Sequence, residues 1–385
     1  MIPLRISRLW IRIVGTTVAV AIAVAVAVAT SAPAERADTN RLTPEAAELA
    51  KLSPRQMAGQ RVIYGYIGLK PPARLLWLIR HGQVGGVVFF AYNISSRAQI
   101  ARVIDQLEAA NANSQNPVRA PLLLMVDQEG GAVRRLPGEP LLSEKQIGRS
   151  AHPAAAAKAA GVGAARNLRG VGMNVDLAPV LDVYRQAGNF IDRYGRSYGM
   201  NPRTVANLGT AFIRALQARG VAATAKHFPG LGAAARAQNT DTRAVTLNLS
   251  KTTLRNFDEL PYKAAIAADV KLVMLSWAVY PKLDSRRPAG LSPTIVQGEL
   301  RSRLGYRGVT ITDSLAAGAL RAYGSLKNKT VLAAKAGMDI MLGGGRTAEQ
   351  CTDALVSGYN NGVLDRTAFL AAVTRVLALR ASLSN

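Results

Sequence analysis

Chemically reactive side chains stand at the ends of short apolar runs in this sequence. Asp313 follows the run Val309–Thr312, while Lys226 and His227 follow the run Val221–Ala225. A buried lysine is costly unless its charge is paired or used, so packing alone poorly explains an apolar strand that ends in lysine and histidine. A carboxylate delivered at the exit of a strand can act as a nucleophile. The pattern indicates a polar site built from the ends of strands.

A second polar block follows the apolar run 122–126. It reads DQEGG from Asp127 to Gly131, and Arg135 comes shortly after it. Paired glycines let the backbone approach a ligand closely. We interpret this block as part of the same site, although an aspartate–arginine pair that only ties down its own loop would leave the same pattern.

Four stretches of the chain, in matching order, resemble glycoside hydrolase family 3. They are the DQEGG block, the loop RSYG at 196–199 where the family has RSFG, the stretch KHFPG at 226–230, and the run that ends at Asp313. The chain is most similar to the single-domain bacterial β-N-acetylglucosaminidases (β-N-acetylhexosaminidases), over residues 50–345. The resemblance implies a retaining hydrolase with Asp313 as nucleophile. It implies sugar-binding roles for Asp127, Arg135, Arg196, Lys226 and His227.

The loop after KHFPG departs from the family pattern. In this branch a mobile loop carries an Asp-x-His dyad whose histidine is the acid/base, whereas here Asp241 is followed by threonine and Arg243. An arginine stays protonated at any working pH, so Arg243 cannot exchange a proton. Three hypotheses follow. Asp241 itself is the acid/base, a glutamate such as Glu129 or Glu139 takes the role, or the protein binds a glycan without efficient turnover.

Other family positions also differ or play supporting parts. Ala132 replaces an arginine, Leu231 a histidine and Trp277 a histidine. The stretch 174–183 matches the family's fourth strand, and we expect its aspartates, Asp176 and Asp182, to support the site. The remaining histidines, His81 and His152, stand in the first half of the chain, in positions that offer no convincing replacement for the missing one.

Strand-like and helix-like segments alternate along the chain. The apolar runs are Val62–Tyr66, Gly85–Phe90, Leu122–Asp127, Asn174–Val180, Val221–Lys226, Leu272–Ser276, Val309–Asp313 and Met338–Leu342, and segments with helical period include Ser96–Asn113, Pro153–Gly170, Pro202–Gly220, Leu254–Ala268, Ser292–Leu304 and Asp365–Leu383. Eight such units predict a TIM-type (β/α)8 barrel, a single domain over residues 51–385. Reactive residues end many strands rather than gathering at one switch point, which favours the barrel over a doubly wound sheet.

The N-terminus resembles a targeting segment. Arg5, Arg8 and Arg12 precede an uncharged apolar run at 14–29, and Ala-Pro-Ala at 32–34 offers a cleavage site. Residues 1–34 are therefore predicted to be a signal peptide, with a retained membrane anchor as the alternative, and residues 35–50 a linker. The run is short of the roughly 20 residues that a spanning helix needs. We expect an exported protein, secreted or associated with the cell envelope.

The amino-acid composition indicates which classes of partner the protein can bind. The 385-residue chain has 48 Lys and Arg against 24 Asp and Glu, a net charge of +24, which suggests an anionic cell-envelope polymer as partner or simply a solvated basic surface. The basic residues form no run typical of nucleic-acid binding, so no specific nucleic acid is expected. With one cysteine, Cys351, no internal disulfide is possible. We expect no metal and no cofactor.

The sequence thus predicts an exported retaining glycoside hydrolase. By resemblance, it removes terminal β-linked N-acetylglucosamine from envelope or peptidoglycan-derived glycans, through a glycosyl-enzyme intermediate on Asp313. Two alternatives stay open: a glycan-binding protein with little or no turnover on the same fold, and a β-glucosidase-type specificity.

Overall fold

Parallel strands form the framework of the protein. The computed structural model describes residue 49 and residues 51–383, and in these residues eight parallel strands form one sheet. They are β1 (Val62–Tyr64), β2 (Gly86–Phe89), β3 (Leu123–Val126), β6 (Val175–Asp176), β7 (Ala222–Phe228), β8 (Leu272–Leu275), β11 (Val309–Thr312) and β12 (Met341–Leu342). Their spatial order is β11-β8-β7-β6-β3-β2-β1-β12, and a bridge from Ile311 to Ile340 brings the two edges together. The sheet is a nearly closed barrel, which confirms the predicted fold class.

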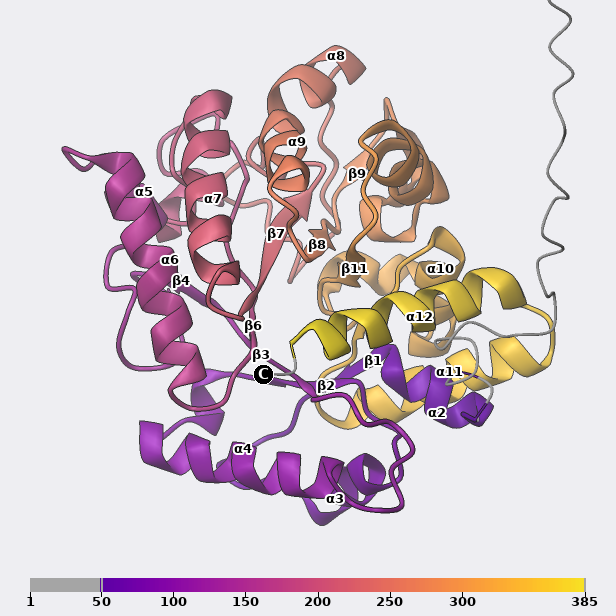
Figure 1. Cartoon of the computed structure of the whole chain (residues 1–385). Helices are drawn as coiled ribbons and strands as arrows, with labels where there is room; N and C mark the ends of the chain where they lie inside the picture. The colour runs from indigo at the N-terminus through magenta and orange to yellow at the C-terminus, as the bar shows by residue number, and fades with distance from the viewer. Residues whose placement is uncertain (1–48, 50, 384–385) are drawn as a thin grey trace, which may run out of the picture. The chain divides into compact units, whose positions relative to one another are not determined.

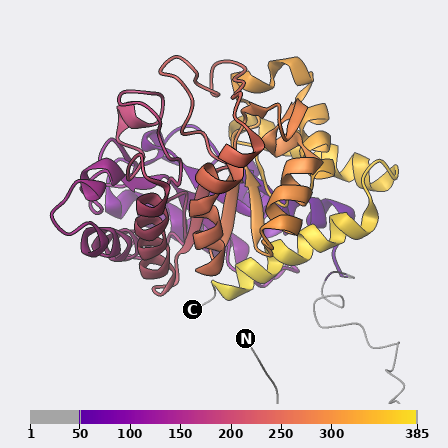
Figure 2. The ribbon, with the colours of Figure 1, turned by 90° about the horizontal axis from the view of Figure 1, so that it is seen from above.

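Helices surround the strands (Figures 1 and 2). The α-helices are α2 (Pro54–Gln60), α3 (Ala73–Arg80), α4 (Arg97–Asn111), α5 (Glu144–Gly148), α6 (Pro153–Arg169), α7 (Pro202–Gln217), α8 (Lys251–Thr253), α9 (Leu260–Ala267), α10 (Leu326–Ala336), α11 (Ala348–Asn360) and α12 (Arg366–Ser382). Cap residues set several starts: Ser53 forms a capping box with Gln56 ahead of α2, and the Asn201 side chain accepts hydrogen bonds from two backbone N–H groups of α7.

Alternation along the strands divides the apolar residues between two layers. In β3, Leu123 and Met125 belong to the cluster inside the barrel, whereas Leu124 and Val126 belong to the cluster between the strands and the helices. The inner cluster also receives Val376 and Leu379 of α12. The last helix therefore packs against the barrel's interior as well as its outside.

Several predicted elements differ in detail from the observed ones. The predicted strand 174–180 is shortened to β6, and beyond it Val180 makes one isolated bridge to Lys226. The predicted helix 254–268 is divided, because a π-helical turn, Leu254–Asp258, precedes α9. The predicted helix 292–304 forms as the π-helix Thr294–Arg303.

Two hairpins and several short helices were not anticipated. The pairs are β4 (Gln128–Gly130) with β5 (Val133–Arg134), and β9 (Val279–Tyr280) with β10 (Asp284–Pro288). The 3-10 helices are Ala91–Asn93, Asp192–Tyr194, Ala289–Leu291, Gly318–Tyr323 and Gly345–Thr347. They belong to loops, where no hydrophobic period marks them.

The predicted export segment, residues 1–34, and nearly all of the predicted linker lie outside the described residues. Every described residue belongs to one compact unit of the chain, Thr43–Asn385. Within the described part, no helix is both long and apolar enough to cross a membrane.

Candidate active site

A cavity of about 540 Å³ lies at the carboxyl ends of the barrel strands. The structure brings all seven residues singled out from the sequence to its wall: Asp127, Arg135, Arg196, Lys226, His227, Asp241 and Asp313. The wall also includes three aromatic residues, Phe90, Phe190 and Tyr194, that sequence reasoning missed. They stand at the end of β2 and in the loop after β6, where no sequence pattern distinguishes a wall residue from an ordinary loop residue.

Lys226 lies at the centre of a buried ionic cluster. Its Nζ is 2.6 Å from Asp127 Oδ1 and 2.8 Å from Glu129 Oε1. Arg196 donates to both carboxylate oxygens of Glu129, through Nε at 2.9 Å and Nη2 at 2.8 Å. Burial disfavours the charge on Lys226, but the two carboxylates outweigh that effect and raise its pKa. Lys226 therefore stays a cation.

Glu129 is the hub of this cluster in the sense that it pairs with both cations, Lys226 and Arg196. The sequence analysis did not predict this pairing. Burial opposes its charge, yet the Arg196 guanidinium and the Lys226 ammonium outweigh burial and hold the pKa of Glu129 at about 2. A carboxyl that stays ionised at neutral pH is a poor proton donor. Glu139 pairs with Arg166 and is absent from the cavity wall. The geometry thus favours neither glutamate as the acid/base.

His227 is held by an aspartate beneath it. Its Nδ1 lies 2.7 Å from Asp182 Oδ2, and Asp182 Oδ1 also accepts from the backbone N–H of Leu231 at 2.6 Å. A carboxylate on Nδ1 fixes the ring orientation and leaves Nε2 for another partner. The pairing of β7 with β8 shifts register between Lys226 and Phe228, and the adjacent side chains of Lys226 and His227 both reach the cavity wall. Asp182 thus has the supporting position that we expected from the sequence.

Asp313 is half-buried immediately after β11. Its Oδ1 accepts a hydrogen bond of 2.6 Å from the backbone N–H of Ser314. Trp277, which is 1% exposed, donates from its indole Nε1 to the carbonyl oxygen of Ser314 at 2.9 Å. Trp277 therefore holds the backbone beside Asp313.

Asp241 shares the cavity with Asp313. The Asp241 residue is exposed as a whole, but partial burial of its carboxyl group and, after it, the negative charge of Asp313 raise the pKa of Asp241 above its usual value. A raised pKa is what a carboxyl needs to deliver a proton near neutral pH. Arg243 is exposed and is absent from the cavity wall.

The two other histidines lie away from this wall. His81 stacks on Trp77 with ring centroids 4.0 Å apart, and its Nδ1 lies 2.7 Å from the Trp77 carbonyl oxygen. His152 is exposed just before α6. Neither of these histidines lines the cavity, whereas Asp241 and Asp313 both do.

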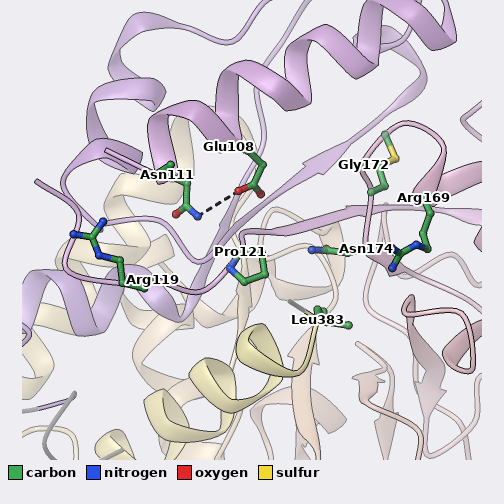
Figure 3. A pocket seen from close by; sticks show the side chains of 10 residues that line it. Glu108, Asn111, Arg119, Pro121, Arg169, Gly172, Asn174 and Leu383 are labelled. Carbon is green, nitrogen blue, oxygen red and sulfur yellow. Dashed lines mark hydrogen bonds between the residues drawn. The ribbon is translucent and has the colours of Figure 1, made fainter. Parts of the chain in front are cut away.

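A second cavity, of about 500 Å³, lies near the amino ends of β3 and β6 (Figure 3). Glu108 and Asn111 of α4 line it and form a hydrogen bond of 3.3 Å with each other. Asn174 binds the backbone on either side of Leu123, donating to the Leu122 carbonyl and accepting from the Leu124 N–H, both at 2.8 Å.

Among the described residues, no group of three or more His, Cys, Asp or Glu side chains could hold a metal ion.

Sequence comparisons link this geometry to known glycosidases. Residues 54–379 match the family described as "Glycosyl hydrolase family 3 N terminal domain". An "uncharacterized secreted glycosyl hydrolase" from Arthroderma benhamiae is 46% identical over 330 residues, which are 85% of this chain and 93% of that protein. A β-hexosaminidase from Nitrosomonas eutropha is 32% identical over 271 residues, which are 69% of this chain and 74% of that protein.

Solved structures agree with this assignment. A family 3 β-N-acetylglucosaminidase from Paenibacillus sp. superposes with a TM-score of 0.81 at 34% identity, over 87% of this chain and 64% of that chain. A β-N-acetylhexosaminidase from Beutenbergia cavernae superposes with a TM-score of 0.76 at 32% identity, over 86% of this chain and 99% of that chain. The chain therefore belongs to glycosyl hydrolase family 3, a family of O-glycosyl hydrolases.

Proposed function

We propose that this protein is a retaining β-N-acetylhexosaminidase that removes terminal β-linked N-acetylglucosamine. The observation that carries the proposal is the pair Asp241 and Asp313, which share one cavity with the predicted sugar-binding residues. Partial burial and, after it, the charge of Asp313 raise the pKa of Asp241. Retaining hydrolysis of a glycoside requires two carboxyl groups, one as the nucleophile and one as the acid/base.

The first step forms a glycosyl-enzyme. The Asp313 carboxylate attacks the anomeric carbon and forms a C–O bond, while the bond to the leaving oxygen breaks and Asp241 gives that oxygen its proton. In the second step water attacks the same carbon, Asp241 takes one proton from it, and the bond to Asp313 breaks. Two displacements at one carbon return the original β configuration.

The ionic cluster supplies the contacts that hold the sugar. Asp127 accepts hydrogen bonds from sugar hydroxyls, and Lys226 and Arg196 donate them from positions fixed by Glu129. Arg135 and the free Nε2 of His227 add further contacts at the wall. Hydrogen bonds that involve charged groups are roughly twice as strong as neutral ones, so a small sugar can be oriented firmly.

The substrate class rests on the relatives and on charge. Structures similar to this chain are named β-N-acetylglucosaminidase and β-N-acetylhexosaminidase, and a similar sequence is named secreted. We propose that the protein is exported and acts on envelope or peptidoglycan-derived glycans. Its net charge of +24 would attract an anionic envelope polymer at long range. Salt should weaken that attraction, because a Debye length shrinks to about 8 Å at physiological ionic strength.

The departure of the Asp241 loop from the family pattern favours a second candidate, a glycan-binding protein with little turnover. By the sequence resemblance, Arg243 takes the place of the family's acid/base histidine, and the sugar-binding residues alone would serve a binding protein. A binding protein would retain N-acetylglucosamine but hydrolyse no glycoside.

Hydrolysis of dinitrophenyl β-N-acetylglucosaminide and β-glucoside by the full chain and its Asp313→Asn variant separates these candidates. A dinitrophenolate leaves without needing a proton, so a weak acid does not limit the first step. We expect turnover of the N-acetylglucosaminide that the variant loses, with the β anomer of the sugar seen first by NMR. Sugar binding without turnover would establish the binding protein, and preferred hydrolysis of the glucoside would establish the other specificity.

A further inference from the structure

The loop that carries Asp241 is fastened to the turn that follows Asp313. The backbone N–H of Gly318 donates to the carbonyl oxygen of Asp241 at 2.7 Å, and the N–H of Ala319 donates to the carbonyl oxygen of Thr240 at 3.0 Å. These two bonds join the loop after β7 directly to the segment after β11. The two predicted catalytic carboxyls therefore belong to backbones that contact each other.

Gly318 is buried where the two backbones meet. A Cβ at this position would overlap the carbonyl carbon and oxygen of Thr242 and lie 2.8 Å from its Cα. Since the obstructing atoms are backbone, no side chain can turn aside to make room. Any larger residue at position 318 must push the segment 240–242 away.

Hydrogen bonds within the loop that carries Asp241 fix its backbone conformation. Asn239 accepts a hydrogen bond of 2.8 Å from the Asp241 N–H through its side chain, and its carbonyl oxygen accepts from the Arg243 N–H at 3.1 Å. Further along, the N–H of Leu247 donates to the Val279 carbonyl oxygen at 2.9 Å. Hydrogen bonds within the loop thus hold its backbone in one conformation, and the contact with Gly318 joins it to the segment that follows Asp313.

We propose that Gly318 is a positioning residue, whose missing side chain sets the distance between the acid/base Asp241 and the nucleophile Asp313. The inference rests on the proposed function, because it takes Asp241 as the acid/base. The two carboxyls of a retaining glycosidase must stand about 5–5.5 Å apart. A misplacement of about 1 Å can cost on the order of 100-fold in rate, so a backbone contact at this point has direct catalytic value.

The Gly318→Ala variant of the full chain tests the proposal through the leaving group. A displaced Asp241 protonates the leaving oxygen poorly, so kcat/KM for phenyl β-N-acetylglucosaminide should fall by about 100-fold. Dinitrophenyl β-N-acetylglucosaminide needs no proton in the same step, and its kcat/KM should stay within about threefold of the wild type, because only the assisted step loses its acid. Added azide should raise kcat of the variant on that substrate, because azide attacks the glycosyl-enzyme without a base.

Gly298→Ala is the matched control. Gly298 is exposed on a helix, and a Cβ there meets no atom within 4 Å, so both rates should stay at the wild-type value. Ala319→Pro is the second test variant, since it removes the N–H that binds the Thr240 carbonyl at the start of the 3-10 helix, where proline is tolerated. It should show the same selective loss, and it decides the question if Gly318→Ala fails to fold.

The Asp241→Asn variant tests the role of Asp241 as acid/base separately from the positioning role of Gly318. An equal effect of this variant on both substrates would overturn Asp241 as the acid/base and the positioning role with it. A selective loss in Asp241→Asn, with equal rates or a uniform fall in a folded Gly318→Ala, would overturn the positioning role of Gly318 alone. Selective losses in both variants support the proposal.

Discussion

Both ends of the barrel bury a carboxylate between cations that line a cavity, but the cations at the two ends differ in what else they bind. At the carboxyl end, Glu129 pairs with Lys226 and Arg196, which also line the site. Near the amino end of β12, Asp339 accepts from Arg301 at 2.6 Å and from Arg375 at 2.8 Å.

The difference lies in what else the cations bind. Arg301 also donates to the carbonyl oxygens of Tyr306 and Gly308, so its guanidinium is occupied by structural partners. The Asp339 backbone oxygen accepts from buried Arg61 at 3.0 Å. Lys226 and Arg196, by contrast, bind only side-chain carboxylates among the described residues. We therefore expect the cluster at the amino end to serve the fold alone, and the cluster at the carboxyl end to position the proposed sugar-binding groups as well.

The sharpest test of this contrast is Glu129→Gln. Removing one partner from a buried ion pair costs about 3–5 kcal/mol of stability, and here it also frees two cations to shift within the site. We expect the free energy of unfolding to fall by that amount and kcat/KM on dinitrophenyl β-N-acetylglucosaminide to fall by about 100-fold. Urea denaturation and steady-state kinetics measure the two losses. Unchanged kinetics in the folded variant would show that Glu129 serves stability alone.

Asp339→Asn should give the stability loss without the kinetic one. It removes the charge between Arg301 and Arg375, so we expect the free energy of unfolding to fall by about 3 kcal/mol. Rates per folded molecule should stay at the wild-type value. Asp353→Asn is the control, because the Arg55–Asp353 pair is exposed on both sides and should contribute less than about 1 kcal/mol. A fall in the kcat of Asp339→Asn at low urea would contradict the expected difference between the two ends of the barrel.

The third test uses pH and Asp176, which is fully buried at the end of β6. Burial, partly offset by a hydrogen bond from the Gln128 N–H, raises the pKa of Asp176 to about 8. An unfolded aspartate titrates near pH 4, so the native state holds the extra proton between about pH 4 and pH 8. Its contribution to stability is complete below about pH 4 and is lost as the pH rises to about 8.

The slope of stability against pH measures this group. Asp176 should lower the free energy of unfolding by at most about 1.4 kcal/mol per pH unit across that window. In Asp176→Asn this contribution disappears, and urea denaturation at intervals from pH 4 to pH 8 should show a flatter slope. An unchanged slope would mean that Asp176 is ionised in the native state at neutral pH.

The sequence predicted the barrel because each strand carries its own apolar run, and several of these runs end at a reactive residue. It also predicted that the seven residues singled out from the sequence share one site, since parallel strands present their carboxyl ends at one face. It did not predict Glu129 as the hub, because its partners Arg196 and Lys226 come from distant loops and strands. The contact of Gly318 with Thr242 could not be predicted either, since a contact between two backbones leaves no pattern of side chains in the sequence.

The packing of the last helix, α12, has a consequence for when the chain can fold during its synthesis. Val376 and Leu379 of α12 fill part of the barrel's interior, and Arg380 donates to the carbonyl oxygens of Ala120 and Pro121 beside β3. β1 also pairs with β12, so the sheet joins residues from the two extremes of the described chain. Contacts of such long sequence separation form late and slowly. The barrel therefore cannot complete its packing until about residue 380 has been synthesised.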